Sequence, residues 1–554
     1  MDAVSTESTG SVRLHTMGKD SEVDSSQSKV ISAKAIKNSG YLAGLNKVTE
    51  AVISEHYLHR LTQQDDLRLY TDEEFNAKSV LFSEDHFTQR LLPALRSHSA
   101  TFVQRRVEAA RRRVKERAGH LKGRELAVEL ITEALFDRQF LKGARSNISR
   151  PYLRKQITHV LSNNLPLRMV IPALPYKSSS PLKSRGLLPD LGDACFLLSA
   201  AELAAVLDQL SKTDTQYQPP IPAQFTVVCD GRRFNHFLNE PDERISAYIG
   251  MIREWIAALE ISTHVQIIDY RAVIEDMLPP AVAAKKSRIR QDAIIKYTNL
   301  MMPIFNPRDI ITTCADAIAR DPDPESENPE NRFVPLFKSL IYIINSPQLH
   351  AYSARSSETY ADVYFRITKS IFTPIATLSV SELAAVSTWM SQEDSPRPEQ
   401  AHIDEYLRLS MLEETWLAVI DYISEIKSDR DLDIDSVTMM MPNCLRYTIH
   451  AKVGQLAFLA TTLRDPVQPW HASGVIMRSR GTRVKVYNLP ILKLEGDQHQ
   501  PVLVDPEASV THPILKAFQE HNQPLFYVQE SIGQGDPSAM LSVIEQGLNR
   551  KRKK

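Results

Sequence analysis

Cysteine is scarce in this chain of 554 residues, and its four copies, Cys195, Cys229, Cys314 and Cys444, lie far apart. Neither a CxxC metal site nor a disulfide framework follows from that spacing, so a reducing compartment is expected. No stretch approaches the roughly eighteen uncharged apolar residues that a membrane span needs. The N-terminus also lacks the apolar run of a signal peptide. These absences predict a cytoplasmic protein that neither crosses nor binds a membrane.

An excess of charge of one sign is missing as well, because 66 basic residues face 67 acidic ones and the net charge is −1. That balance argues against a nucleic-acid-binding protein, which usually carries a basic face. The glycine-rich phosphate loops GxxxxGK[ST] and GxGxxG do not occur, so neither a P-loop nor a dinucleotide site is expected. The hydrophobic fraction of 43% is ordinary for a globular protein and predicts a packed core.

The composition and the hydrophobic pattern of the sequence change several times along the chain. Residues 1–40 are polar and poor in aromatics, which predicts a disordered tail. Residues 41–160 place apolar residues at helical spacings and predict a helical N-terminal extension. Residues 161–500 are expected to form one α/β domain, with residues 280–440 as a mainly helical insertion. Residues 501–554 form a C-terminal segment with a basic tail.

Three short apolar runs, Leu167–Leu174, Phe225–Cys229 and Val265–Ile268, alternate with amphipathic helical patterns at Ala194–Leu210 and Asp242–Leu259. Strand and helix in this alternation predict a parallel sheet covered on both faces. Beyond residue 440 the pattern becomes β-like. The fold class expected is therefore α/β: a Rossmann-like parallel sheet core with an N-terminal helical extension, a helical insertion and a C-terminal β-rich segment.

The first candidate site is the segment Ile171–Asp190, IPALPYKSSSPLKSRGLLPD, which leaves the first predicted strand. Open α/β sheets bind ligands at the carboxyl ends of their strands. Lys177, Lys183 and Arg185 supply cations there and Ser178 a hydroxyl, a combination suited to a phosphate group. From composition alone, a solvated loop of serines and lysines is the favoured interpretation.

The second candidate is VVCDGRRF, where Asp230 follows the second predicted strand and Gly231 permits a sharp turn. Asp230 could orient a substrate or act as a base, and Arg232 could pair with an anion. The alternative is that Asp230 caps a turn and that the arginines are exposed.

The third candidate is discontinuous and joins RYTIHAK to the later Trp470–His471. Alternation along a strand would place Arg446, His450 and Lys452 on one face. Histidine is well suited to proton transfer near neutral pH, although a His beside a Trp also fits a packed structural pair.

In this order, the segments PALPYKSSSPLKSRGLLPD, TVVCDGRRF, NCLRYTIHAK and PWH resemble the isocyanide (isonitrile) synthases of the pyoverdine/dityrosine biosynthesis family, over roughly residues 160–500. The chain departs from the usual family pattern at three places. Leu174 stands where an aromatic residue is common, Cys229 where serine is common, and Thr448–Ala451 where the family usually reads Ser-Ile-His-Pro.

The resemblance implies an enzyme of natural-product biosynthesis that converts the α-amino group of an amino acid, such as tyrosine, tryptophan or another apolar one, to an isonitrile. Ribulose 5-phosphate, the co-substrate, would supply the carbon, with no metal and no other cofactor. A downstream iron/2-oxoglutarate oxygenase would be the pathway partner. Two alternatives stay open: an enzyme of the dityrosine type that forms an N-formyl amino acid, and a non-catalytic regulator that binds a sugar phosphate.

The resemblance also implies roles for the candidate residues. Those expected to bind the phosphosugar are Lys177, Ser178, Lys183 and Arg185. Asp230 and Arg232 would position polar groups of the substrates, with Asp230 counted among the catalytic residues. Proton transfer would fall to His450 and His471, with Arg446 and Lys452 as anion partners.

Overall fold

The computed structural model describes residues 56–142, 149–321, 332–373, 377–392, 394–449, 456–460, 468–478, 484–533 and 536–549. Several sequence predictions lie outside these residues: the disordered tail at 1–40, the basic tail at 550–554, and the site residues His450 and Lys452.

The predicted parallel sheet is present and has five strands in the order β4-β3-β2-β5-β6. They are β2 (Arg168–Pro172), β3 (Gln224–Cys229), β4 (Val265–Asp269), β5 (Leu445–Thr448) and β6 (Leu456–Ala457), and every pairing is parallel. The chain moves outward from β2 through β3 to β4 and then returns to the other side of β2. Such a reversal creates a switch point between β2 and β5, where open α/β sheets bind their ligands. The Rossmann-like sheet core is thus confirmed.

Two helices of this α/β unit match the sequence prediction. Helix α8 (Leu191–Ser211) begins at Asp190, whose side chain forms a capping box with Asp193. It is rich in Ala and Leu on all sides, and it is buried along nearly its whole length because it packs against strands of both sheets of the protein. Helix α10 (Asp242–Ala258) buries one apolar face and contacts β4 and α8.

The segment before β2 is mainly helical, as predicted. Helices α5 and α6 pack on α8. The basic face of α5 is not simply solvated, because Arg113 and Arg117 form ion pairs with Glu133 and Glu129 of α6 at 2.8 and 2.6 Å. The helices of this segment are α3 (Tyr57–Thr62), α4 (Asp72–Lys78), η1 (His86–Leu91), α5 (Leu92–Ala118), α6 (Gly123–Leu135) and α7 (Arg150–Ser162).

The β-rich C-terminal region forms a second sheet in the order β1-β9-β10-β7-β8. Its strands are β1 (Val80–Phe82), β7 (Ser473–Arg478), β8 (Val484–Leu489), β9 (Gln500–Val504) and β10 (Phe526–Val528). Strand β1 comes from the N-terminal segment and pairs in parallel with β9, so the two ends of the chain share one sheet. The helices of this region are η8 (Pro469–His471), α19 (Ile491–Gly496), α20 (Pro513–Glu520), α21 (Glu530–Gly533) and α22 (Pro537–Asn549).

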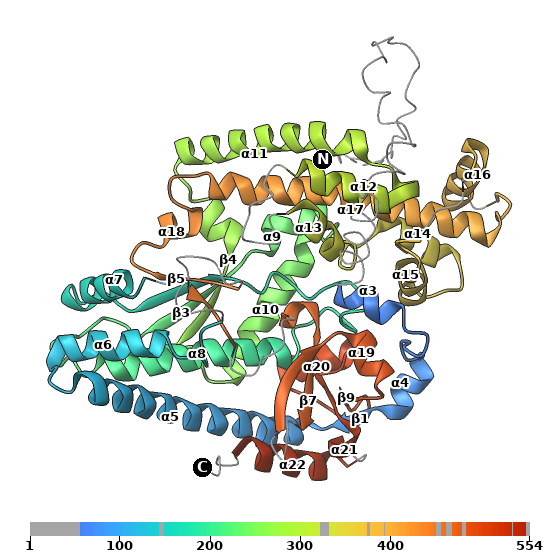
Figure 1. The fold of residues 1–554 in the computed structure, drawn as a ribbon. Helices are drawn as coiled ribbons and strands as arrows, with labels where there is room; N and C mark the ends of the chain where they lie inside the picture. Colours follow the sequence, from blue (N-terminus) through green and yellow to red (C-terminus); the bar gives the residue numbers. More distant parts are fainter. Residues whose placement is uncertain are drawn as a thin grey trace, which may run out of the picture. The chain divides into compact units, whose positions relative to one another are not determined.

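Between β4 and β5 the chain is helical, as predicted. Helices α11 (Pro280–Met301) and α17 (Gln400–Arg430) run side by side (Figure 1). The shorter helices before β5 are α9 (Gly231–Phe234), η3 (Asn235–Phe237), η4 (Arg271–Glu275), η5 (Met302–Ile304), η6 (Pro307–Asp309), α12 (Ile310–Arg320), α13 (Phe333–Leu340), α14 (Pro347–Arg355), α15 (Tyr360–Lys369), α16 (Val380–Ser391) and α18 (Ser436–Met440). Within the described residues, none of the helices combines the length and apolar character of a membrane span.

Candidate functional site

The loop that follows β2 is hydrogen-bonded to the Pro-Trp-His segment, although almost 300 residues separate them. Lys177 Nζ donates to the carbonyl oxygen of Pro469 at 2.9 Å. The backbone N–H of Ser178 donates to the carbonyl oxygen of Trp470, also at 2.9 Å. Trp470 is buried and packs edge-on against Phe196. Two motifs of the sequence thus meet next to β2, at the carboxyl edge of the parallel sheet.

Lys177 is fully buried, and its ammonium lies between two carboxylates. Its Nζ is 2.7 Å from Asp193 and 3.0 Å from Asp190. Burial opposes the charge of Lys177, but the two carboxylates outweigh burial and raise its pKa. Burial raises the pKa of Asp190 to about 6. Tyr248 donates to Asp193 at 2.8 Å and the N–H of Gly474 to Asp190 at 3.1 Å, so this lysine joins the loop to α8, α10 and β7.

Lys183 lies at the other end of the same loop and differs sharply from Lys177. Its exposed fraction is 9%, yet no carboxylate of the described residues lies within ion-pair distance of its ammonium. Burial lowers the pKa of Lys183 to about 7. This lysine is therefore a buried cation without a protein counter-ion in the part of the chain that is described.

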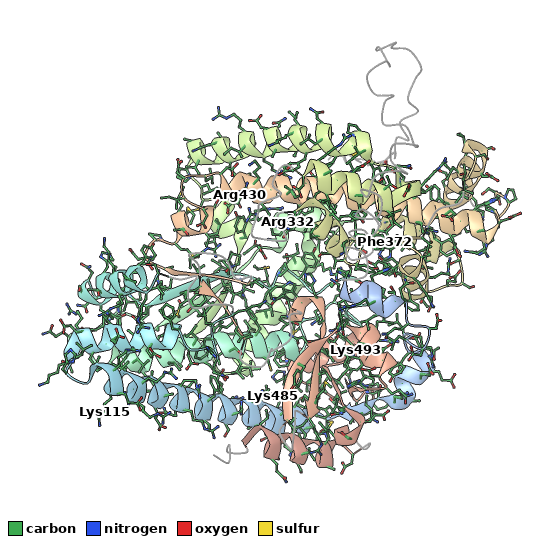
Figure 2. All side chains as sticks on the ribbon, in the orientation of Figure 1. Lys115, Arg332, Phe372, Arg430, Lys485 and Lys493 are labelled. Carbon is green, nitrogen blue, oxygen red and sulfur yellow. The ribbon has the colours of Figure 1, made fainter. Side chains whose placement is uncertain are left out.

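Lys183 is close enough to His56 for its charge to lower the pKa of that histidine. The ring of His56 stacks on Tyr342 with 4.9 Å between centroids, and Tyr342 Oη lies 3.1 Å from His59 Nδ1. Burial, and after it the nearby charges of Lys183 and Lys338, lower the pKa of His56 to about 3. Phe372, labelled in Figure 2, packs edge-on against His59. We call Lys183, His56, His59 and Tyr342 the Lys183 cluster.

A second polar cluster adjoins the loop and is acidic. Glu240 is buried and forms an ion pair with Arg244, whose guanidinium also donates to the carbonyl oxygen of Lys177 at 2.7 Å. Burial raises the pKa of Glu240 despite Arg244, and the neighbouring hydroxyl of Ser179 lowers it slightly. Glu414 of α17 is mostly buried beside Ser346, and burial raises its pKa to about 7.

Tyr360 lies near both carboxylates of this acidic region. After burial, which is the largest cause, the charges of Glu240 and Glu414 both raise the pKa of Tyr360. In the described residues, no cation lies within ion-pair distance of Glu414. We call Glu240, Arg244, Ser179, Ser346 and Glu414 the acidic cluster. It joins the β2 loop to the helical insertion.

The segment DGRRF packs directly under the β2 loop. A Cβ atom at Gly231 would lie 2.2 Å from the carbonyl oxygen of Pro175, so only glycine fits there. Asp230 is partly buried at the end of β3 and is close enough to Tyr176 to contribute to the raised pKa of its hydroxyl. Asp230 directly follows β3, as the sequence predicted, and the fold places it beside the β2 loop.

The arginines of DGRRF are engaged by acidic partners. Arg232 forms an ion pair with Asp269 of β4. Arg233 is buried and pairs with Glu425 of α17 at 2.8 Å, and Lys286 of α11 approaches the same carboxylate at 3.2 Å. These contacts tie the helical insertion to the sheet, so Arg233 has a structural role that the sequence did not reveal.

Two other predicted cations have acidic partners of their own. Arg185 lies 2.8 Å from Asp72 and 3.2 Å from Glu495, and its guanidinium stacks 3.7 Å above the ring of Phe75. Arg446 on β5 lies 3.7 Å from Asp435, and burial lowers its pKa.

Of the predicted site residues, the structure gathers Lys177, Ser178, Lys183, Asp230 and His471 around the β2 loop. Sequence patterns did not predict His56, Tyr342, Glu240, Arg244 and Glu414 as site residues. Only the spacing of Glu240 and Arg244, which lie four residues apart across the start of α10, offered a signal. His56, Tyr342 and Glu414 belong to no sequence motif, and only the folded chain brings them near the loop.

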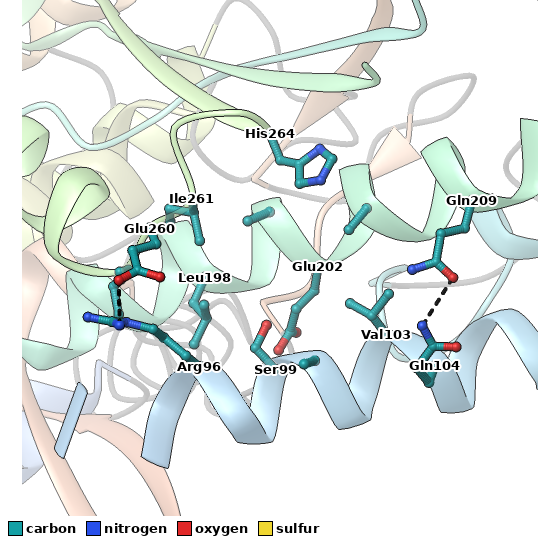
Figure 3. Close-up of a pocket in the computed structure, with 14 residues that line it drawn as sticks. Arg96, Ser99, Val103, Gln104, Leu198, Glu202, Gln209, Glu260, Ile261 and His264 are labelled. Atoms are coloured by element: carbon teal, nitrogen blue, oxygen red, sulfur yellow. Dashed lines mark hydrogen bonds and ion pairs between the residues drawn. The ribbon is translucent and has the colours of Figure 1, made fainter. Parts of the chain in front are cut away.

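A groove of about 320 Å³ lies elsewhere, between α5, α8 and the turn before β4 (Figure 3). Arg96, Glu202, Glu260 and His264 are among its lining residues. It adjoins the amino end of β4, and no predicted site residue lines it. The described residues also contain no group of three His, Cys, Asp or Glu side chains that could hold a metal ion.

Comparison with known proteins identifies relatives of part of the chain. Residues 157–323 match the family described as pyoverdine/dityrosine biosynthesis protein. The L-tryptophan isonitrile synthase AmbI2 of Fischerella ambigua is 32% identical over 98 residues, which are 18% of this chain and 27% of that protein. The isocyanide synthase A of Aspergillus fumigatus is 27% identical over 118 residues, which are 21% of this chain and 19% of that protein.

The aligned part of this chain thus spans about a quarter of the length of the curated relatives, or less. The crystal structure of the PvcA protein from Pseudomonas aeruginosa overlaps 72% of this chain and 99% of its own at 16% identity, with a TM-score of 0.37, and an overlap of that quality carries no argument. The resemblance predicted from the motifs is confirmed for part of the chain: residues 157–323 match the pyoverdine/dityrosine biosynthesis family, and named isonitrile and isocyanide synthases are similar to a part of this chain.

Proposed function

We propose that this protein is an isocyanide synthase that converts the α-amino group of an amino acid to an isonitrile, with the carbon supplied by ribulose 5-phosphate. One observation carries the proposal. The motifs shared with isocyanide synthases converge at the switch point of the parallel sheet, where Lys177 and Ser178 bind the backbone of Pro469 and Trp470. The relatives named as isonitrile and isocyanide synthases support the reaction class.

The two clusters on the β2 loop suit the two substrates. Ribulose 5-phosphate brings a dianionic phosphate, and Lys183 is a buried ammonium without a carboxylate partner in the described residues. The amino acid brings an ammonium, and Glu414 is a mostly buried carboxyl without a cation partner there. An amino acid and a sugar phosphate that both bind beside the β2 loop would bring amine and ketone together for condensation to an imine, which releases water.

Proton transfer falls to residues close to that point. The amine must lose a proton before it attacks the ketone, and a carboxyl whose pKa is about 7, as at Glu414, is poised to accept one. Asp230 and His471 are the further candidates for acid–base catalysis, because both lie at the β2 loop. Lys177 would act as a positioning residue, since both of its carboxylate partners and the Pro469 carbonyl already occupy its ammonium.

The proposal is tested by incubating the purified chain with each proteinogenic amino acid and with ribulose 5-phosphate labelled at its ketone carbon. The expected product is an amino acid that has gained the labelled carbon and lost two hydrogens. A product that has gained carbon and oxygen indicates the N-formyl reaction instead. Binding of ribulose 5-phosphate without turnover of any amino acid indicates a regulator. Either result overturns the isonitrile assignment.

A further inference from the structure

The groove between α5 and α8 lies at the amino end of β4, away from the β2 loop at the carboxyl edge of the same sheet (Figure 3). Small side chains line it on both helices, with Ala100 on α5 and Ala201 and Ala205 on α8, and they leave space where the two helices face each other. Its volume of about 320 Å³ falls within the range of small-ligand pockets, roughly 300–1,000 Å³. The groove is therefore large enough for one small molecule.

A polar pair stands at each end of the groove. At one end Arg96 forms an ion pair with Glu260 at 2.5 Å, and at the other Gln104 Nε2 donates to Gln209 at 3.3 Å (Figure 3). Arg96 and Gln104 are eight residues apart on α5, so about 12 Å of helix separates the two pairs. The larger apolar side chains that line the space between them are Val103, Leu198, Leu259 and Ile261. The groove is thus a short apolar slot with a cation at one end.

Glu202 brings a carboxyl group into this apolar slot. It is only 3% exposed, and in Figure 3 its carboxyl end lies beside Ser99, which is about one helical turn from Arg96. A buried carboxylate is costly, and a cation compensates that cost. Because a carboxylate accepts several hydrogen bonds, partners within the protein leave it able to accept from a bound ammonium. An acidic and a basic side chain therefore line the same short groove.

Arg96 is able to bind a second carboxylate. The side chain of its partner Glu260 is 68% exposed, and an ion pair with an exposed partner contributes little stability. Arg96 Nη2 also donates to the carbonyl oxygen of Ala258 at 3.0 Å. A guanidinium has five N–H groups, so these two contacts leave donors for the carboxylate of a ligand.

We propose that this groove is a second binding site of the protein and that its ligand is an apolar α-amino acid. The ammonium of the ligand pairs with Glu202 and its carboxylate with Arg96. The apolar side chain lies in the slot between Val103 of α5 and Leu198 of α8. The site is separate from the reaction at the β2 loop, and it does not depend on the proposed function.

The test measures binding to the full chain by calorimetry with three probes: L-phenylalanine, phenethylamine, which lacks the carboxylate, and 3-phenylpropanoate, which lacks the ammonium. Glu202→Gln removes the charge at nearly constant size, and Ala100→Leu narrows the groove and keeps every charge. The matched controls are Glu108→Gln on α5 and Ala384→Leu on α16, at exposed positions outside the groove. Thermal unfolding verifies that each variant is folded. Ala100 is itself exposed, so its substitution tests the groove even if Glu202→Gln does not fold.

The Kd of L-phenylalanine should rise about 10-fold or more in both variants and stay within about twofold of the wild-type value in the controls. The wild type should bind phenethylamine roughly 10-fold more weakly than L-phenylalanine, and 3-phenylpropanoate more weakly still, because its only charge meets Glu202. Equal affinities for phenethylamine and L-phenylalanine overturn the assignment of an amino acid.

Undetectable binding of L-phenylalanine to the wild type, or an unchanged Kd in Ala100→Leu, overturns the site. The site also fails if the Kd rises in Glu414→Gln and not in the groove variants, since the amino acid is then bound at the β2 loop. A Kd that rises in the groove variants supports the site even if the protein forms no isonitrile, so this result is distinct from a failure of the proposed function.

Discussion

The two buried lysines of the β2 loop lie six positions apart and have opposite surroundings. Lys177 is enclosed by Asp190, Asp193 and a backbone carbonyl, so its charge is fully used within the protein. Lys183 is buried, its charge acts on the pKa of His56, and it has no carboxylate partner in the described residues. The first arrangement stabilises the fold, and the second costs stability unless an anion binds. The difference separates a lysine that builds the loop from one that is available to a ligand.

The largest effect is expected for Lys177→Met. The substitution leaves two buried carboxylates without their cation, so the free energy of unfolding should fall by roughly 3–5 kcal/mol. Chemical denaturation followed by circular dichroism measures this loss, with Lys212→Met as the exposed control. A loss below about 1 kcal/mol would show that Asp190 and Asp193 find other partners, and the comparison with Lys183 would then fail.

Lys183→Met should act in the opposite direction and remove a pH dependence. The folded-state pKa of Lys183 is about 7, below its ordinary value, so the unfolded chain binds more protons above pH 7. The wild type should therefore gain roughly 1 kcal/mol per pH unit between about pH 7 and 10, and Lys183→Met should lack this gain. Denaturation curves at pH 7, 8 and 9 in buffers without phosphate test the difference between the two proteins.

The sequence predicted much of the fold but not the different surroundings of Lys177 and Lys183. Continuous apolar runs predicted β2, β3 and β4, because strands of a parallel sheet are buried on both faces. Because both residues are lysines, nothing in the sequence indicated that Lys177 and Lys183 would differ. The difference depends on Asp193, which lies 16 positions from Lys177, and on the burial of Lys183 without a carboxylate partner in the described residues. Glu414 could not be found for the same reason: its burial against Ser346 is a product of helix packing.

Glu414→Gln tests the acidic side of the loop. The folded-state pKa of Glu414 is about 7, above its ordinary value, so the folded protein binds the extra proton and the wild type should lose stability as pH rises from about 5 to 7. The glutamine variant should lack that loss of roughly 1 kcal/mol per pH unit. It should also form isonitrile at least about 100-fold more slowly, with the KM for ribulose 5-phosphate unchanged. Glu413→Gln, whose side chain is exposed, is the neighbouring control.

The smallest effect is expected for Arg185→Lys. This substitution tests whether every cation of the loop binds the ligand. Arg185 binds Asp72 and Glu495 and stacks on Phe75, so its planar guanidinium is used on the side of the loop that faces α4 and α19. Lysine keeps the charge but loses the fork and the stack, which should lower the free energy of unfolding by about 1 kcal/mol. The KM for ribulose 5-phosphate should stay within twofold of the wild-type value, roughly 0.4 kcal/mol. A larger rise in that KM would place Arg185 with Lys183 as a phosphate ligand. A residue that only anchors the loop to α4 should not change the KM for ribulose 5-phosphate more than the KM for the amino acid.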